Sequence, residues 1–374
     1  MPEEKLLFTP GPLSTTPTVK QAMLRDLGSR DAAFLAVVRE IRQELLAVGG
    51  VEEPDYTAIP IQGSGTFAVE AMLGAAVPRD GLLLVAVNGA YGRRMVQIAE
   101  CLKIAWEAVE FPENRAVEVE RLSEVLASGR RFTHLACVHC ETTTGLLNPI
   151  ERVGQLCGRF GVGFLVDAMS SFGGVPLNVA SAHVDFLVSS ANKCIQGVPG
   201  FGFALARREA LEGCAGHARS VSLDLLAQWR GLEADGQFRF TPPTHALLAF
   251  RQALRELAEE GGVPARFARY SANHGELLRG MRALGFETYL DGHLQGPIIT
   301  SFLYPPGPAF DFGRFYAMLN ERGFVIYPGK LSQAAAFRIG TIGRLGLAEM
   351  QALLAAIAGV LSEMGIPVPI GARG

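Results

Sequence analysis

Short apolar runs alternate with amphipathic stretches along the chain up to about residue 260. The runs that we expect to form strands are residues 56–61, 82–87, 104–109, 133–138, 163–167, 185–189 and 202–206. The stretches with helical spacing between them are residues 67–76, 92–102, 119–128 and 150–160. Such alternation is typical of a mostly parallel sheet covered by helices on both faces, and continuous apolar runs such as LLLVAV fit strands buried on both sides. The pattern therefore predicts an α/β fold with a mostly parallel seven-stranded sheet.

The pattern changes after residue 260, where EEGGVP reads as the end of a helix followed by a break. A long helix is expected over residues 264–284 and a last helix over residues 345–364. Between them, strands are expected near residues 298–302 and 324–327. We therefore predict a large domain over residues 14–260 and a smaller α+β domain over residues 261–374. We expect the Pro- and Gly-containing N-terminal arm, residues 1–13, to pack on the smaller domain.

Composition narrows the classes of partner. The chain has 374 residues with 34 Lys and Arg against 37 Asp and Glu, and this near-balance gives no reason to expect binding to nucleic acid or to an anionic membrane. Six cysteines are too few for a disulfide framework, and the start, MPEEKLLFTPGPL, lacks the apolar core of a secretory signal. No apolar run approaches the roughly 20 residues that span a bilayer. We expect a cytoplasmic protein whose partners are small molecules or a second copy of the chain.

The segment Gly63-Ser64-Gly65-Thr66 follows an expected strand and opens an expected helix. Glycine lets the backbone approach an anion, and a helix N-terminus offers free N–H groups, so the segment suits phosphate. The letters GSGTFA also satisfy the dinucleotide-binding form G-x-G-x-x-A. That alternative needs an acidic residue about 20 positions on, where this chain has Asn88. The loop alone therefore leaves phosphate binding and an ordinary strand-to-helix turn open.

Two further residues that could take part in binding or catalysis lie at or just after the ends of expected strands. Asp167 ends an apolar strand at the sheet edge where ligands sit in open α/β sheets. A carboxylate there can cap a turn, bind a metal or pair with a protonated ring nitrogen. Lys193, flanked by small residues after the next strand, is poorly placed for solvation, and partial burial lowers a lysine pKa toward the range of a Schiff-base amine. A phosphate loop, a strand-end Asp and a strand-end Lys together favour pyridoxal phosphate over a nicotinamide cofactor.

Other motifs fail on spacing. Cys137 and Cys140 have C-x-x-C spacing without a second pair for zinc, so two packing cysteines are favoured over a redox site. The segment GFVIYPGK, residues 323–330, has five residues between its glycines and Leu331 where a phosphate-binding loop needs Ser or Thr. The histidines show no metal-like pairing, so no metal site is predicted.

Longer blocks of the chain resemble the class V pyridoxal-phosphate-dependent aminotransferases. These blocks are TPGPL (9–13), GSGT (63–66), NGAYG (88–92), HCETTTG (139–145), VDAMSSFGG (166–174) and SSANKCIQGVPGFGF (189–203). The resemblance extends from about residue 6 to about residue 360. It implies the pyridoxal-phosphate transferase fold of type I, pyridoxal 5′-phosphate as cofactor, and a homodimer with active sites at the interface.

The resemblance also implies a role for each matching residue around the cofactor ring. Lys193 would carry the cofactor as a Schiff base, and Asp167 would pair with the pyridine nitrogen. Tyr91 takes the position of the aromatic residue that stacks on the ring. Thr142 or Thr143 would contact or flank the phenolic oxygen, and both remain candidates.

The anion-binding roles come from the same resemblance. Ser64, Gly65 and Thr66 would hold the cofactor phosphate, helped by Thr241 from a second subunit. Arg338, in FRIG, matches the arginine that binds the substrate carboxylate, where a two-pronged guanidinium suits a planar anion.

Three blocks are similar to the branch of the family that transfers the amino group of 2-aminoethylphosphonate to pyruvate, giving phosphonoacetaldehyde and L-alanine. These blocks are GHARSVSLDLLAQWR (216–230), FRFTPPTH (238–245) and FVIYPGK (324–330). The resemblance implies a ping-pong reaction in phosphonate catabolism. One departure is Thr341, where the family pattern has Asn, and it bears on the amino-acceptor side of the site.

Competing functions are weighed against the same residues. Alanine–glyoxylate or serine–pyruvate transamination shares the cofactor chemistry, and the phosphonate-type blocks alone disfavour it. Cysteine desulfuration needs a downstream cysteine, and none follows Cys214. A nicotinamide oxidoreductase would leave Lys193 without a role, and so would a binding protein without catalysis.

Overall fold

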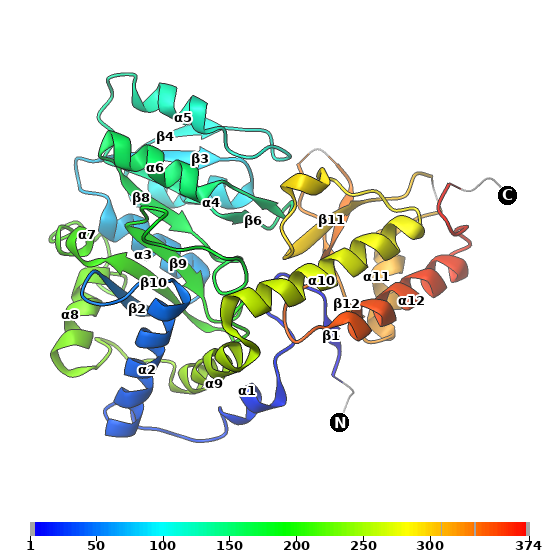
Figure 1. Cartoon of the computed structure of the whole chain (residues 1–374), viewed down its shortest axis with the longest axis horizontal. Coiled ribbons are helices and arrows are strands. Elements are labelled where there is room, and N and C mark those ends of the chain that lie inside the picture. The colour runs from blue at the N-terminus through cyan, green and yellow to red at the C-terminus, as the bar shows by residue number, and fades with distance from the viewer. Residues whose placement is uncertain (1–3, 308, 333, 372–374) are drawn as a thin grey trace.

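The computed structural model describes residues 4–307, 309–332 and 334–371 (Figure 1). The predicted N-terminal arm is therefore described from residue 4 onward, and residues 308, 333 and 372–374 of the predicted small domain lie outside the described residues. Within the described ranges, no helix is long and apolar enough to cross a membrane.

The large sheet contains seven strands of the described chain in the order β2-β10-β9-β8-β5-β3-β4. Their bounds are β2 Tyr56–Gly63, β3 Leu82–Val87, β4 Ala105–Glu110, β5 His134–Val138, β8 Gly163–Asp167, β9 Phe186–Ser190 and β10 Gly200–Arg207. β10 runs antiparallel to both of its neighbours, and the other pairs are parallel. The predicted mostly parallel seven-stranded sheet is confirmed.

Helices pack along this sheet as the apolar spacing predicts. The helices of this part are α1 Pro17–Gln21, α2 Ala32–Val48, α3 Gly65–Ala76, α4 Ala90–Cys101, α5 Val119–Leu126, α6 Ile150–Phe160, α7 Arg208–Glu212, α8 Leu225–Asp235 and α9 Thr244–Glu260. In α6, the buried residues Ile150, Val153 and Cys157 recur every three or four positions and face the sheet core, and the helix ends at Gly161 in the left-handed conformation. The strands and these helices enclose one apolar core.

A second core belongs to the C-terminal part (Figure 1, yellow to red). Its elements are α10 Gly262–Ala283, the short 3₁₀ helix η1 Gly292–Leu294, β11 Ile299–Leu303, α11 Phe312–Glu321, β12 Phe324–Val325, β13 Tyr327–Pro328, β14 Ala336–Gly340 and α12 Leu347–Glu363. β11, β14 and β13 form an antiparallel sheet in that order. β1, Leu6–Leu7, pairs in parallel with β12, and β6, Cys140–Glu141, pairs with β7, Leu146–Leu147. The domain boundary at residue 260 stays a prediction.

The predicted strand over residues 324–327 is wrong in one respect. β12 and β13 are separated by the fully buried Ile326, and they join different sheets, because β12 pairs with β1 and β13 pairs with β14. An apolar run does not reveal such a change of partner.

Several elements were not predicted from the sequence, among them α2, α8, α11 and β14, and for α9 only its end near residue 260 was expected. The buried residues of α2 include Phe34, Val37, Val38, Ile41 and Leu45, whose helical spacing could have revealed this helix. β14 is harder to recognise, because Arg338 interrupts its apolar run.

Candidate active site

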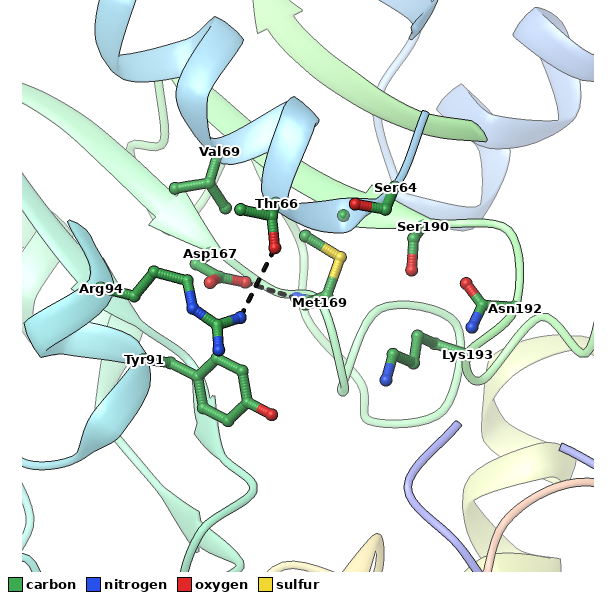
Figure 2. A pocket seen from close by; sticks show the side chains of 11 residues that line it. Ser64, Thr66, Val69, Tyr91, Arg94, Asp167, Met169, Ser190, Asn192 and Lys193 are labelled. Atoms are coloured by element: carbon green, nitrogen blue, oxygen red, sulfur yellow. Dashed lines mark hydrogen bonds between the residues drawn. The ribbon is translucent and has the colours of Figure 1, made fainter. Parts of the chain in front are cut away.

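The chemical residues meet at the carboxyl edge of the large sheet, around a cavity of about 200 Å³. The lining residues are Ser64, Gly65, Thr66, Val69, Tyr91, Arg94, Asp167, Met169, Ser190, Asn192 and Lys193. They come from the start of α3, from α4 and from the ends of β8 and β9. Figure 2 shows Asp167, Tyr91 and Lys193 projecting into this space from separate elements. The edge is the expected one, because parallel strands present their carboxyl ends together.

Lys193 lies in the turn after β9 and reaches into the cavity (Figure 2). Its Nζ donates a hydrogen bond to the carbonyl of Pro10 at 3.1 Å, so the N-terminal arm closes over the amine. Burial lowers the pKa of Lys193, and the nearby Asp167 and Cys194 oppose that shift. A buried amine with a lowered pKa has a larger neutral, nucleophilic fraction near neutral pH.

Asp167 ends β8 and is only 4% exposed. Burial raises its pKa to about 6, while the N–H of Met169, which donates to Oδ1 at 2.9 Å, and the charge of Arg94 act in the opposite direction. The second carboxylate oxygen, Oδ2, accepts no hydrogen bond from the residues that the structure describes. A buried carboxylate in this state is suited to a cationic N–H partner, such as a protonated ring nitrogen.

Ser64 is the N-cap residue of α3, but its side chain forms no hydrogen bond to the N–H groups of that helix. At Gly65, a Cβ atom would lie 2.3 Å from the sulfur of Met169, so a larger residue there would displace the Met169 side chain. The first turn of α3 therefore presents backbone N–H groups, two hydroxyls and the positive end of a helix dipole to the cavity. This arrangement fits a phosphate group.

Arg94 is a lining residue that was not predicted from the sequence. Its guanidinium lies 4.9 Å from the centre of the Tyr91 ring, and Nη1 is 3.5 Å from Oγ1 of Thr66 (Figure 2). Arg94 follows Tyr91 by one helical turn, so helical spacing from Tyr91 could have identified it. Val69, Met169, Ser190 and Asn192 carried no comparable signal, because their place in the lining depends on how the loops fold together.

Behind Tyr91 lies a second buried carboxyl group, Glu141. Its Oε1 accepts hydrogen bonds from the backbone N–H groups of Tyr91, at 3.1 Å, and Gly92, at 2.8 Å, in the first turn of α4. Burial raises the pKa of Glu141 to about 7, although these backbone bonds oppose the shift. The hydroxyl of Thr143 donates to Glu141, whereas no hydrogen bond within the described structure engages the hydroxyl of Thr142.

Arg338 is 1% exposed and belongs to β14, in the second sheet. Its Nη1 donates to the carbonyl of Thr142 at 2.7 Å and its Nε to the carbonyl of Pro328 at 3.0 Å. Nη2 is buried and has no partner in the part of the chain that the structure describes. The guanidinium is thus held by neutral carbonyls with a donor to spare, which suits an anionic ligand. Arg338 does not line the 200 Å³ cavity itself.

Three other positions lie apart from this cavity. Thr241 is exposed and does not line it, and its carbonyl accepts a hydrogen bond from Gln62 at 3.2 Å. Thr341 donates its hydroxyl to the carbonyl of Pro297 at 2.8 Å and is fully buried. Asn88 is buried against Asn148 and the carbonyl of Arg115, so its amide is already occupied and no acidic group stands there for a ribose.

Comparison with known proteins is consistent with this geometry. The 2-aminoethylphosphonate–pyruvate transaminase of Salmonella typhimurium is 54% identical over 355 residues, covering 94% of this chain and 96% of that protein. The protein of the same name from Syntrophobacter fumaroxidans is 53% identical over 361 residues, covering 96% and 97%.

Among solved structures, alanine–glyoxylate aminotransferase from Nostoc sp. is similar with a TM-score of 0.89 at 30% identity, over 96% of each chain. Ureidoglycine–glyoxylate aminotransferase from Bacillus subtilis shares the fold with a TM-score of 0.89 at 22% identity, over 99% of this chain and 96% of that one. The model of the family described as "Aminotransferase class-V" matches residues 19–338. The chain therefore belongs to the class V aminotransferase family.

Proposed function

We propose that the protein transfers the amino group of 2-aminoethylphosphonate to pyruvate, giving phosphonoacetaldehyde and L-alanine, with pyridoxal 5′-phosphate as cofactor. The observation that carries the proposal is the 54% identity, along nearly the whole chain, to an enzyme named for that reaction. The geometry of Lys193, Asp167 and the start of α3 supports the cofactor assignment.

The residues around the cavity fit the cofactor in charge and shape. The first turn of α3 at Ser64, Gly65 and Thr66 suits its phosphate, and the buried Asp167 suits its ring nitrogen. Tyr91 presents an aromatic face to the same cavity. When bound, pyridoxal phosphate supplies an electron sink that stabilises negative charge on the carbon bearing the substrate amine.

Lys193 is proposed to do two things in turn. Its amine would hold the cofactor covalently until the substrate amine displaces it. The freed Nζ would then accept the proton from the substrate carbon that carries nitrogen, because burial keeps part of the lysine population neutral. The Asp167 carboxylate would keep its ring-nitrogen partner protonated through both half-reactions.

Thr142 is our choice between the two candidate threonines for the contact with the phenolic oxygen. The hydroxyl of Thr143 already faces Glu141, so it has less freedom to turn toward the cofactor. Thr142 also lies beside the anion-binding side of the site, since its carbonyl holds Arg338.

Arg338 is proposed to bind the phosphonate in one half-reaction and the carboxylate of pyruvate in the other. Both groups are anions that can accept from two guanidinium donors, and ping-pong turnover lets one site serve them in sequence. If replacement of Arg338 by Ala raises the KM of only one substrate, the shared role is wrong.

A homodimer would complete the site. Thr241 does not line the cavity of its own subunit. Phe67 and Phe240, which neighbour Thr66 and Thr241 in the sequence, are 50% and 45% exposed. Large exposed apolar side chains next to a ligand cavity favour coverage by a partner of the same sequence. Light scattering tests this: a monomer that retains its cofactor would remove both the dimer and the contact from Thr241.

The deciding experiment is a half-reaction. The purified yellow protein is mixed with 2-aminoethylphosphonate alone, without pyruvate, and the absorbance spectrum is recorded. Loss of the absorbance of the covalently bound cofactor would establish cofactor, donor and reaction type together. A protein bleached by alanine or serine, and unaffected by 2-aminoethylphosphonate, would instead be an alanine– or serine–glyoxylate aminotransferase, which the 30% identity to the Nostoc enzyme keeps as the second candidate.

A further inference from the structure

A buried carboxylate outside the cavity joins the large sheet to the second sheet. Glu113 lies in the loop after β4 and is only 8% exposed. Its Oε1 accepts the hydroxyl of Tyr289 at 3.1 Å and the backbone N–H of Ser332, also at 3.1 Å. Glu113 forms no ion pair with any residue that the structure describes, so these two donors are what holds it.

Ser332 belongs to the hairpin loop that joins β13 to β14. This hairpin carries the guanidinium of Arg338 and much of what orients it. The carbonyl of Pro328 accepts a hydrogen bond from Nε of Arg338. The centre of the Tyr327 ring lies 5.1 Å from the guanidinium carbon of Arg338. A shift of the hairpin would therefore move the guanidinium together with two of its supports.

The other end of the Glu113 loop is fixed to the large sheet beside the cavity. The N–H of Phe111 donates to the carbonyl of Val87 at 2.8 Å, and the amide of Asn88 donates to the carbonyl of Arg115 at 2.9 Å. Val87 and Asn88 lead directly into the start of α4, where Tyr91 enters the cavity. Glu113 thus connects the strand end that places Tyr91 with the hairpin that places Arg338.

We propose that Glu113 is a positioning residue, which holds the β13–β14 hairpin so that Arg338 lies at the correct distance from the amine of Lys193. This inference rests on the proposed function, in which Arg338 binds the anionic groups of both substrates. Hydrogen bonds to a carboxylate are roughly twice as strong as neutral ones, which suits a contact that must fix a loop. Burial, with the Glu113 charge beside it, raises the pKa of Tyr289 to about 12, so its hydroxyl stays a donor at neutral pH.

The test compares three variants of the cofactor-loaded enzyme: Glu113→Ala, Glu113→Gln and Tyr289→Phe. Glu113→Ala removes both bonds and is expected to raise the KM of pyruvate and of 2-aminoethylphosphonate about tenfold each, with kcat changed less than about threefold. Glu113→Gln keeps an oxygen acceptor for Ser332 and an amide that can bond to Tyr289 but loses the charge, so its KM values should rise by only about threefold. Tyr289→Phe removes one bond and should fall between them.

Hydrogen exchange gives a readout that does not depend on substrate. The backbone amides of β13 and β14 should exchange faster in Glu113→Ala than in wild type, while those of β8 and β9 keep their rates. A fall in kcat with both KM values unchanged, unaltered exchange in the hairpin, or a Glu113→Gln enzyme as impaired as Glu113→Ala would each overturn the positioning role. If Glu113→Ala does not fold, the KM values and exchange of Tyr289→Phe decide the question.

Failure of the proposed function is recognised separately. A wild-type enzyme that does not respond to 2-aminoethylphosphonate refutes the substrate assignment, and the same three variants are then compared with the donor that does bleach the cofactor. Faster hairpin exchange together with unchanged KM for that donor and for pyruvate would leave Glu113 a structural contact only and refute the positioning role.

Discussion

The two sides of the site are built by different means. On the large sheet, Lys193 and Asp167 follow strand ends that meet at one edge, and burial shifts the pKa of each: downward for the amine and upward for the carboxyl group. On the small sheet, Arg338 is 1% exposed, and backbone carbonyls of Thr142 and Pro328 orient it. Arginine remains charged in such surroundings. In the proposed function, the chemical side therefore depends on tuned protonation, whereas the recognition side depends on the direction of a fixed charge.

The largest effect should come from removing the amine on the chemical side. Lys193→Arg keeps the positive charge but cannot attach the cofactor or act as a neutral base, so kcat should fall on the order of 10⁴-fold. The measurement is kcat together with the absorbance of the protein-bound cofactor. Lys103→Arg, at an exposed lysine, is the matched control and should behave as wild type. Appreciable turnover in Lys193→Arg would refute the assignment.

Asp167 offers a sharper comparison, because the chain holds a second buried aspartate at the opposite end of the neighbouring strand. Asp167→Asn should lower kcat by about 10²–10³-fold, since an amide cannot keep a ring nitrogen protonated. Asp185 instead accepts the N–H of Phe164 and pairs with Arg207. Asp185→Asn should therefore lower the unfolding temperature and leave kcat nearly unchanged. Equal losses of kcat in the two variants would show that burial, and not the site, explains the effect.

On the recognition side, Arg338→Lys keeps the positive charge but loses the planar guanidinium group, which can donate two parallel hydrogen bonds to one anion. The KM values of both substrates should rise about 10–100-fold, with a smaller change in kcat. Arg266 is a suitable control, because it is equally buried but pairs with Glu260 and with the carbonyl of Cys194. Arg266→Lys should cost stability and leave both KM values close to those of wild type. A kcat effect larger than the KM effect in Arg338→Lys would place Arg338 on the chemical side.

The last prediction concerns stability, not turnover, and involves the buried carboxyl group behind Tyr91. Burial raises the pKa of Glu141 from its usual value of 4.5 to about 7. Between these two values the folded protein holds a proton that the unfolded chain releases, so the stability of the wild type should fall as pH rises through this window. Each tenfold difference in proton affinity between the folded and unfolded states corresponds to about 1.4 kcal/mol.

Glu141→Gln does not titrate and supplies the reference for that measurement. The free energy of unfolding of wild type minus that of Glu141→Gln should decrease from about pH 4.5 to about pH 7 and then level off. Urea unfolding at a series of pH values measures this difference. A difference that increases with pH would mean that the carboxylate is stabilised by the α4 N-terminus and that its pKa is lowered instead.

The fold could be predicted where the local pattern of apolar residues reveals which segments are buried. Strands buried on both faces must be apolar along their length, and LLLVAV and GFLVD form strands with the predicted bounds. β14 escaped prediction because Arg338 stands in its middle, and a charged residue is compatible with a buried strand only where other segments supply carbonyl acceptors. The division of residues 324–328 between two sheets likewise depends on distant partners.

The sequence by itself determined that Lys193, Asp167 and the Ser64–Thr66 loop lie together around one cavity. Asp167 ends one strand of the large sheet, and Lys193 and the Ser64–Thr66 loop follow two others. Parallel strands bring their carboxyl ends to one edge. Only the tertiary structure decided where Glu113 lies and what holds Arg338. Ser332, a partner of Glu113, lies 219 positions away along the chain, and Thr142, a partner of Arg338, lies 196 positions away. Contacts at such separations depend on how the two cores pack together, and no local periodicity encodes them.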